Sequence, residues 1–429
     1  MSNSDKQGEA LRQATDEQLE QAVAANHQQL FVSNATALGG TVYRDQGLVY
    51  THTANNGAEV AFPKFNGAEI GVQLDRMMQH YRHLEAGHIG FWSLYPAQPP
   101  DLGAYLLARG FQPGWWPYWM VLEPSTLREG FNTPGALAIT PDNDTAIVSI
   151  AGLPYGDGGA FTPALLGVYP VQAQRFLARI NGQVVGQTCL FFTEGLLGIA
   201  GMYNVGVLPT HQRQGIGKAL VIAASQFAFA KGYRYVMLNA NHIGRRTYEQ
   251  VGFRFVGMGR TWWIVNKNYL RQTVSPGLTA LAEATGRGAI AAMEKAYDAL
   301  TKEELDQALP NGMTVMQVAA YFKQQAAAQW LIDRQATCSP LDAWDLGWHQ
   351  QAADILRQQP GIVNRTYLDY RGTLLHVAAD RNDMALARLA LDAGIDLQIL
   401  DAQYQATGLG WAQHLGRFAL ITLIKEKMS

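Results

Sequence analysis

The sequence has little cysteine, little net charge and no long apolar run. Its two cysteines, Cys189 and Cys338, lie far apart without metal-ligand spacing, which excludes a disulfide framework and is typical of a reducing compartment. A net charge of −2 and a pI near 6.6 leave no basic surface for nucleic acid or anionic lipid. The N-terminal residues are polar and show no signal sequence, and the longest apolar run, 219–230, is too short to span a bilayer. We therefore expect a soluble, cytoplasmic protein without nucleic-acid or membrane partners.

A metal site is also not expected. His80, His83 and His88 lie close together in the sequence, but no carboxylate or cysteine accompanies them at ligand spacing. We interpret them as surface or packing histidines.

The chain is organised around residues 196–256. An apolar strand candidate ends at Val207, Pro209 breaks it, and a polar turn with Gly215 and Gly217 leads into a helix over 215–230. A glycine-rich turn at a helix N-terminus favours anion binding, because unpaired N–H groups and the helix dipole point at the ligand.

Two common phosphate-binding motifs do not fit this turn. A P-loop requires glycine at position 212 and Ser or Thr after Lys218, but the chain has Gln212 and Ala219. A dinucleotide-binding fingerprint requires a small residue at position 220, where Leu220 stands.

A different pattern does fit. The turn reads Gln-x-x-Gly-x-Gly from Gln212, and Asn241, Tyr248, Gly252 and Phe253 follow at fixed spacing. Together these two motifs, with strand, helix and strand between them, resemble the acyl-CoA signature of the GCN5-related N-acetyltransferases (GNAT). The resemblance covers residues 134–265.

This resemblance implies direct transfer of an acetyl group from acetyl-CoA, as co-substrate, to an amine, with no metal. It implies that the backbone around the glycine turn holds the CoA pyrophosphate, that the strand before it pairs with the pantetheine arm and polarises the thioester oxygen, and that Asn241 bonds the CoA arm or caps the following helix. The implied cofactor-binding residues are Val205, Gly206, Val207, Gln212, Arg213, Gln214, Gly215, Ile216, Gly217, Lys218, Asn241 and Tyr248.

The resemblance also implies that Tyr248 protonates the leaving thiolate; alternatively, Tyr248 is a core tyrosine packed under Phe253. No acid lies on the strand 196–207, where many relatives carry the general base. The remaining candidates for the base are Glu194, Asp157, His242, or a water relay through Tyr203 or Asn204.

The first part of the chain contains a partial repeat of the second. Shifted forward by 142 residues, Gly110-Phe111 falls on Gly252-Phe253, but Leu106 replaces Tyr248 and no glycine motif precedes it. We interpret residues 1–125 as a degenerate GNAT copy without CoA binding, which shapes the acceptor site or an interface. An unrelated α/β domain is the alternative. Residues 134–268 are the predicted catalytic copy.

The predicted fold class is therefore α/β (α+β): tandem GNAT folds with a mixed central sheet and helices on both faces. Periodicity and turn residues place the elements. Helices are expected over 17–31, 70–84, 102–109, about 153–166 and 215–230; strands are expected over 43–50, 60–62, 90–95, 119–122, 136–140, 176–180, 184–193, 196–207, 235–239 and 260–265.

After a linker at 276–288, residues 290–429 change character. The stretch 372–379 and the stretch 391–396 resemble the beginning and end of an ankyrin repeat, and Thr407 and Ser339 recur 34 residues on either side of Thr373. We predict an all-α ankyrin-repeat domain, with His376 in the repeat's own hydrogen-bond frame rather than as a ligand. Such an array recruits a protein partner, self-associates or stabilises its neighbour.

The acceptor is less defined. Aromatic residues at strand ends, Trp115, Trp116, Tyr118, Trp119, Trp262 and Trp263, indicate an apolar, aromatic or cationic acceptor if they line the groove, and core packing if they do not. We expect a small-molecule amine, such as a metabolite or an amine-bearing antibiotic. The alternatives are a protein N-acetyltransferase that recruits its target through the ankyrin repeats, and a non-catalytic acyl-CoA-binding scaffold.

Overall fold

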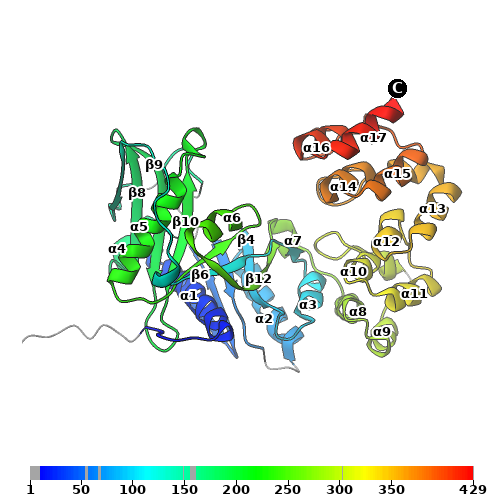
Figure 1. The fold of residues 1–429 in the computed structure, drawn as a ribbon. Helices are drawn as coiled ribbons and strands as arrows, with labels where there is room; N and C mark the ends of the chain where they lie inside the picture. The colour runs from blue at the N-terminus through cyan, green and yellow to red at the C-terminus, as the bar shows by residue number, and fades with distance from the viewer. Residues whose placement is uncertain are drawn as a thin grey trace, which may run out of the picture. The chain divides into compact units, whose positions relative to one another are not determined.

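The computed structural model describes residues 10–53, 57–65, 69–147, 149–154, 161–301 and 303–428. They form two compact units, Met1–Thr273 and Val274–Ser429. In Figure 1 the first unit is a mixed α/β body and the second is helical. Among the described residues no helix is long and apolar enough to cross a membrane.

The first half of unit 1 begins with a long helix whose start is fixed by a capping box. Thr15 and Gln18 exchange side-chain and backbone hydrogen bonds at its N-terminus. The elements of this half are α1 (Asp16–Ala37), β1 (Thr41–Asp45), β2 (Leu48–His52), β3 (Gly57–Ala61), α2 (Ile70–His83), β4 (His88–Tyr95), α3 (Leu102–Ala108), β5 (Gln112–Pro113) and β6 (Tyr118–Leu122).

The second half contains the hairpin predicted from its Asn-Gly turn. Asn181 and Gly182 have φ of 50° and 82°, the left-handed angles that a two-residue hairpin requires. The elements are β7 (Leu137–Pro141), α4 (Pro163–Val168), β8 (Ala173–Ile180), β9 (Gln183–Phe192), β10 (Ala200–Val207), α5 (Ile216–Ala230), β11 (Val236–Ala240), α6 (Arg245–Val251), β12 (Arg254–Ile264) and α7 (Lys267–Arg271).

The two halves share one sheet and exchange their last strands. The order is β1-β2-β3-β4-β12-β6-β11-β10-β9-β8-β7, with β5 paired to β12. Strand β6 of the first half lies between β12 and β11, and β12 of the second half pairs with β4. The parallel pairs are β3 with β4 in the first half and β10 with β11 in the second. Each pair is extended by a strand of the other half, so both halves belong to one continuous sheet.

The structure confirms the internal repeat residue by residue. Gly110 and Gly252 both adopt positive φ, 93° and 112°, after a short helix. The next N–H, of Phe111 or Phe253, donates to the carbonyl of Leu106 or Tyr248 at 3.1 Å in both copies. Shifted back by 142 residues, β12 spans 112–122, the stretch from the start of β5 to the end of β6.

Helices cover both faces of the sheet, as predicted. One apolar cluster packs α1 of the first half against strands of both halves, including Trp92, Trp119, Phe191 and Tyr203. On the other face, α5 packs on β8–β11 through residues such as Leu220. Because α1 crosses both halves, the first half forms a wall of the second.

The described part of unit 2 consists of successive helix pairs, and in each pair a Ser or Thr N-cap begins the first helix. First helices stack on first helices, as α14 does on α16, and second helices do likewise, as α15 does on α17. The pairs are α8 (Pro276–Gly286) with α9 (Ile290–Tyr297), α10 (Val315–Tyr321) with α11 (Gln325–Asp333), α12 (Pro340–Asp345) with α13 (His349–Gln358), α14 (Leu374–Arg381) with α15 (Met384–Asp392), and α16 (Gly408–His414) with α17 (Phe418–Met428).

His376 lies in the hydrogen-bond frame of its own repeat, as predicted. Its Nδ1 accepts the backbone N–H of Thr373 at 3.0 Å, and its Nε2 lies 3.0 Å from the carbonyl of Ala406 in the next repeat. Burial lowers the pKa of His376. The ring therefore links two repeats.

Several expected elements differ from the structure. Residues 43–50, expected as one strand, belong to two strands, β1 and β2, joined by a turn at Gln46 and Gly47, and β12 begins at Arg254 rather than at 260. The linker predicted at 276–288 is wrong: Pro276 occupies the first turn of α8 after the N-cap Ser275, a position where proline needs no N–H donor. Strand β10 begins at Ala200 rather than at 196. The helix expected near 153–166 is only α4, over 163–168; residues 155–160 lie outside the described residues.

Candidate active site

Strand β10 separates from its parallel neighbour halfway along its length. It pairs with β11 only from Ala200 to Met202, whereas it continues to pair with β9 up to Val207. A bulge between Tyr203 and Gly206 bends the strand, and Asn204 within it has φ of 52°. The edge of Val205–Val207 that faces β11 therefore makes no ladder with a described strand.

The chain then turns into the N-terminus of α5. The Gln212 side chain donates to the carbonyl of Val207 at 3.2 Å, which ties the start of the turn to the end of β10. Arg213 and Gly215 have φ of 63° and 80°. Within the described residues no backbone carbonyl accepts from the N–H groups of residues 213–218. Six consecutive donors therefore remain at the positive end of a 15-residue helix.

The two glycines of this turn are required for different reasons. A Cβ on Gly215 would lie 2.1 Å from the carbonyl oxygen of Asn132, so the connection between the halves occupies that space. A Cβ on Gly217 would meet only Val207, at an ordinary 3.7 Å. Glycine at 217 costs helix stability and is not required by protein packing, which leaves room for close approach of a ligand.

Lys218 lies beside the same connection. Its Nζ is 4.2 Å from the centroid of the Phe131 ring, a cation–π distance. The cation is thus held at the turn, where it adds positive potential to the N–H groups.

Tyr248 and Asn241 each show the alternative role considered for them: Tyr248 packs against Phe253, and Asn241 caps the helix that follows it. The Tyr248 ring packs against Phe253 with centroids 5.9 Å apart, and the Asn241 Oδ1 accepts the N–H of Gly244 at 2.7 Å at the start of α6. Neither role excludes a further contact: Tyr248 is half-buried, and the Asn241 side chain is exposed.

Tyr203 points away from the open edge of β10 and into the wall formed by α1. Its hydroxyl donates to Asn26 Oδ1 at 2.7 Å, and burial raises the pKa of Tyr203 well above its usual value. The Asn26 amide in turn donates to the carbonyls of Phe191 and Ile199, both at 3.0 Å. Tyr203 is therefore a structural link between the halves in this arrangement.

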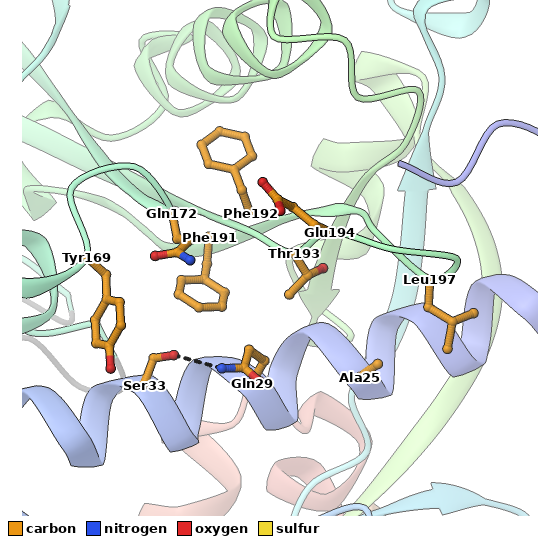
Figure 2. A pocket seen from close by; sticks show the side chains of 10 residues that line it. All are labelled: Ala25, Gln29, Ser33, Tyr169, Gln172, Phe191, Phe192, Thr193, Glu194 and Leu197. Atoms are coloured by element: carbon orange, nitrogen blue, oxygen red, sulfur yellow. Dashed lines mark hydrogen bonds between the residues drawn. The ribbon is translucent and has the colours of Figure 1, made fainter. Parts of the chain in front are cut away.

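The candidates for the general base lie apart from one another. Glu194 lines a cavity at the far end of β10, shown in Figure 2, whereas His242 is exposed after β11. Asp157 lies outside the described residues. Asn204 is half-buried in the bulge next to the open edge of β10. Asn204 is thus the candidate nearest to that edge in the chain.

Sequence reasoning missed the contribution of α1. Asn26 and His27 are buried among the apolar residues of this helix, as are Ser33 and Asn34 nearer its end, and His27 packs on Phe31, Trp92 and Tyr203. Burial lowers the pKa of His27 to about 3, so it is neutral at physiological pH. Two polar residues on the apolar face of the predicted helix 17–31 were the available signal.

Most of the strand-end aromatic residues belong to the core. Trp119 and Trp262 are buried, and only Trp115 and Trp116 are substantially exposed among the tryptophans of this group. Arg260 lies 4.1 Å from the Trp116 ring centroid. No group of three or more His, Cys, Asp or Glu side chains that could hold a metal occurs in the described part of the chain.

Comparison with known proteins places this site in context. Residues 164–253 match the model of the Acetyltransferase (GNAT) family, a segment that contains β10, the glycine turn, α5 and Tyr248. A glucosamine 6-phosphate N-acetyltransferase of Trypanosoma brucei brucei is 30% identical over 83 residues, 18% of this chain and 56% of that protein. The chain thus spans about half the length of this curated relative. These matches support a GNAT acetyltransferase domain in the second half of unit 1.

Solved structures are also similar. A GCN5-related N-acetyltransferase from Kribbella flavida is 20% identical with a TM-score of 0.43, covering 55% of this chain and 94% of that one. A tandem GNAT protein from the clavulanic acid biosynthesis pathway is 15% identical with a TM-score of 0.41, covering 58% and 94%.

Proposed function

We propose that the protein is an acetyl-CoA-dependent N-acetyltransferase that acetylates an amine of a small molecule. The observation that carries this proposal is the anion site at the N-terminus of α5. There, the six N–H groups of residues 213–218 have no backbone acceptor among the residues that the structure describes, and one of these residues is Gly217, a glycine that protein packing does not require. The GNAT match over the same segment supports the proposal.

The residues of the turn suit the CoA pyrophosphate. The N–H groups of Arg213, Gln214, Gly215, Ile216, Gly217 and Lys218 would bind its oxygens, with Gln212 fixing the turn. The open edge of Val205, Gly206 and Val207 would pair with the amides of the pantetheine arm, and an N–H near Val207 would stabilise the negative charge on the thioester oxygen. Acetyl-CoA supplies the activated acetyl group.

Two side chains would handle protons. Tyr248 donates its hydroxyl proton to the departing thiolate of CoA, while Phe253 holds the ring in place. A water at Asn204, in the bulge, takes the proton that the amine loses. Tyr203 was the other residue predicted for the water relay. Its hydroxyl instead donates a hydrogen bond to Asn26, which holds β10 against α1. Asn241 would bond the CoA arm through its amide nitrogen, because its oxygen caps α6.

A small-molecule acceptor is favoured by the name of the curated relative, whose substrate is a sugar amine. We assign residues 1–125 to a degenerate GNAT copy, 134–268 to the catalytic copy, and 290–429 to ankyrin repeats. The 34-residue spacing of the N-caps Ser339, Thr373 and Thr407 supports the last assignment.

Calorimetric titration with acetyl-CoA tests the proposal. Wild-type protein should bind, and Gly217→Glu should abolish binding, because a carboxylate would then occupy the anion site. Ala230→Glu is the matched control, since Ala230 is exposed at the other end of the same helix. It should bind as the wild type does.

Absence of binding to folded wild-type protein, or equal binding by Gly217→Glu, would refute the cofactor assignment. If binding holds, a screen of amines with free CoA detection identifies the acceptor. Turnover with small amines after deletion of the residues beyond Thr273 would separate the small-molecule enzyme from one that recruits a protein target through unit 2.

A further inference from the structure

The connection between the two halves of unit 1 reaches the turn at the start of α5. It comprises residues 127–136, which lie between β6 and β7 and form no helix or strand. The Arg128 N–H donates to the carbonyl of Val251 at 2.9 Å, and the Gln226 side chain of α5 donates to Glu129 at 2.7 Å. These two bonds hold the connection against α5 and α6.

The connection contacts the glycine turn through Asn132 and Phe131. The Asn132 carbonyl oxygen occupies the space beside Gly215. The Phe131 ring faces the Lys218 ammonium group, with 4.2 Å between Nζ and the ring centroid. Phe131 is half-buried and packs against the apolar cluster around α5, which fixes the ring. The attraction between a cation and an aromatic face then keeps the Lys218 ammonium group at the turn.

The chain around Lys218 is basic. Residues 195–248 include no Asp or Glu but six basic residues, which are Arg213, Lys218, Lys231, Arg234, Arg245 and Arg246. Arg234 and Arg245 form ion pairs with acids outside this stretch, whereas Lys218 forms none with any described residue. Lys218 is therefore a cation that is held in place without being neutralised, which suits an anionic group of a ligand.

The position of Lys218 decides what this charge can do. Lys218 lies in the first turn of α5, so a phosphate on the N–H groups of residues 213–218 is within reach of its side chain. Ordering a flexible lysine side chain costs conformational entropy. Phe131 orders the side chain before a ligand binds and, because the ring is uncharged, leaves the positive charge available to the ligand.

We propose that Phe131 is a positioning residue of the cofactor site, which holds the Lys218 ammonium group for a phosphate of acetyl-CoA. The inference rests on the proposed function, since it concerns the same anion site. Acetyl-CoA carries a pyrophosphate and a ribose 3′-phosphate, and the ammonium group suits either. The connection between the halves thus contributes to cofactor binding, although it lies outside the matched segment 164–253.

Calorimetric titration of the full chain with acetyl-CoA tests the proposal. Phe131→Leu keeps an apolar side chain without the ring, and it should weaken binding about threefold to fivefold. Lys218→Met should weaken binding about tenfold. The double variant should bind no more weakly than Lys218→Met alone, because the ring acts only through the ammonium group. Phe131→Tyr, which keeps a ring, should bind as the wild type does.

Lys231→Met is the matched control. Lys231 lies at the other end of α5, and its Nζ is 5.3 Å from the Phe227 ring centroid. The substitution therefore removes the same charge from the same kind of contact, away from the turn. It should leave the affinity for acetyl-CoA unchanged.

Titration with acetyl-CoA that lacks the 3′-phosphate distinguishes the two phosphates. If Lys218 contacts the 3′-phosphate, Phe131→Leu and the wild type should bind this probe equally. If Lys218 contacts the pyrophosphate, the threefold to fivefold loss should persist.

The proposal is overturned if Phe131→Leu binds acetyl-CoA as tightly as the wild type does, if its effect adds in full to that of Lys218→Met, or if Phe131→Tyr binds as weakly as Phe131→Leu. In these cases the wild type still binds acetyl-CoA, and the proposed function stands. Absence of binding to the wild type would instead refute the proposed function together with this inference.

Discussion

The two halves of unit 1 have the same order of helices and strands. They differ in how the two parallel strands of each half pair beside the N-terminus of the helix that connects them. In the first half, β3 pairs with β4 along its whole length, from Gly57 to Ala61. In the second half, β10 leaves β11 after Met202. Strand β3 therefore leaves none of its edge toward β4 unpaired, whereas β10 leaves Val205–Val207 unpaired next to the proposed anion site.

Side chains reinforce this difference. In the first half, Glu59 accepts a hydrogen bond from the Trp92 indole at 3.0 Å, and its carboxyl group lies over Gly90. Helix α2 starts after Glu69, whose negative charge opposes an anion at that terminus. If the proposed CoA site is right, a few residues at one strand end decide whether the same order of strands and helix binds or excludes a phosphate.

The largest expected effect is on turnover and concerns Tyr248, whose equivalent in the first half is Leu106. Tyr248→Phe should lower kcat by about 100-fold or more, because the thiolate then leaves unprotonated, while acetyl-CoA affinity stays unchanged. Steady-state kinetics and calorimetry measure the two quantities. Tyr233→Phe, which keeps the Phe192 contact, should leave kcat unaffected. Wild-type turnover by Tyr248→Phe would remove Tyr248 as the acid.

The next effect concerns the link between the halves. Asn26→Ala should cost roughly 3 kcal/mol of unfolding free energy, because it leaves the buried Tyr203 hydroxyl without its acceptor and removes the amide's hydrogen bonds to the Phe191 and Ile199 carbonyls. Urea denaturation measures the loss. Gln29→Ala on the same helix, which breaks only a local bond, should change stability by less than about 0.5 kcal/mol. A similar small effect for Asn26→Ala would show that the halves are held together elsewhere.

A smaller effect concerns the closed strand pair of the first half. Burial raises the pKa of Glu59 to about 8, so between its ordinary value and pH 8 the folded state binds one more proton than the unfolded state. Stability should therefore fall as pH rises across that window.

Glu59→Gln should remove this slope and stabilise the protein by about 2 kcal/mol at pH 6, with little effect at pH 4.5. Thermal denaturation at several pH values follows the change. The same substitution at exposed Glu69 is the control and should give no such slope. A difference between Glu59→Gln and the wild type that is independent of pH would contradict the assignment of a buried, neutral carboxyl group.

The smallest effect distinguishes the two glycines of the anion site. Gly217→Ala should stabilise the fold by about 0.5 kcal/mol, because alanine favours the helix, yet weaken acetyl-CoA binding about tenfold. Gly215→Ala should destabilise the fold instead, because φ is 80° and Asn132 blocks the methyl group. Thermal denaturation with calorimetry reports both signs. Loss of stability in Gly217→Ala would mean that protein packing requires this glycine.

The sequence determined the local elements and the second half's motif order. Asn181-Gly182 fixed a hairpin, Pro209 ended β10, and the glycine turn began α5, because each depends on the backbone preferences of a few adjacent residues. The repeat was also visible, since Gly110 and Gly252 must both adopt left-handed angles after a helix. The site residues assigned from the GNAT resemblance, Tyr248 above all, remain predictions.

Only the tertiary structure decided how the halves depend on each other. The exchange of β6 and β12 joins strands more than a hundred residues apart, and local patterns carry no information on such pairing. The same holds for Asn26, whose four partners come from the other half. A buried amide is stable only when distant chain segments satisfy its hydrogen bonds, so its role appears only once those segments are brought together.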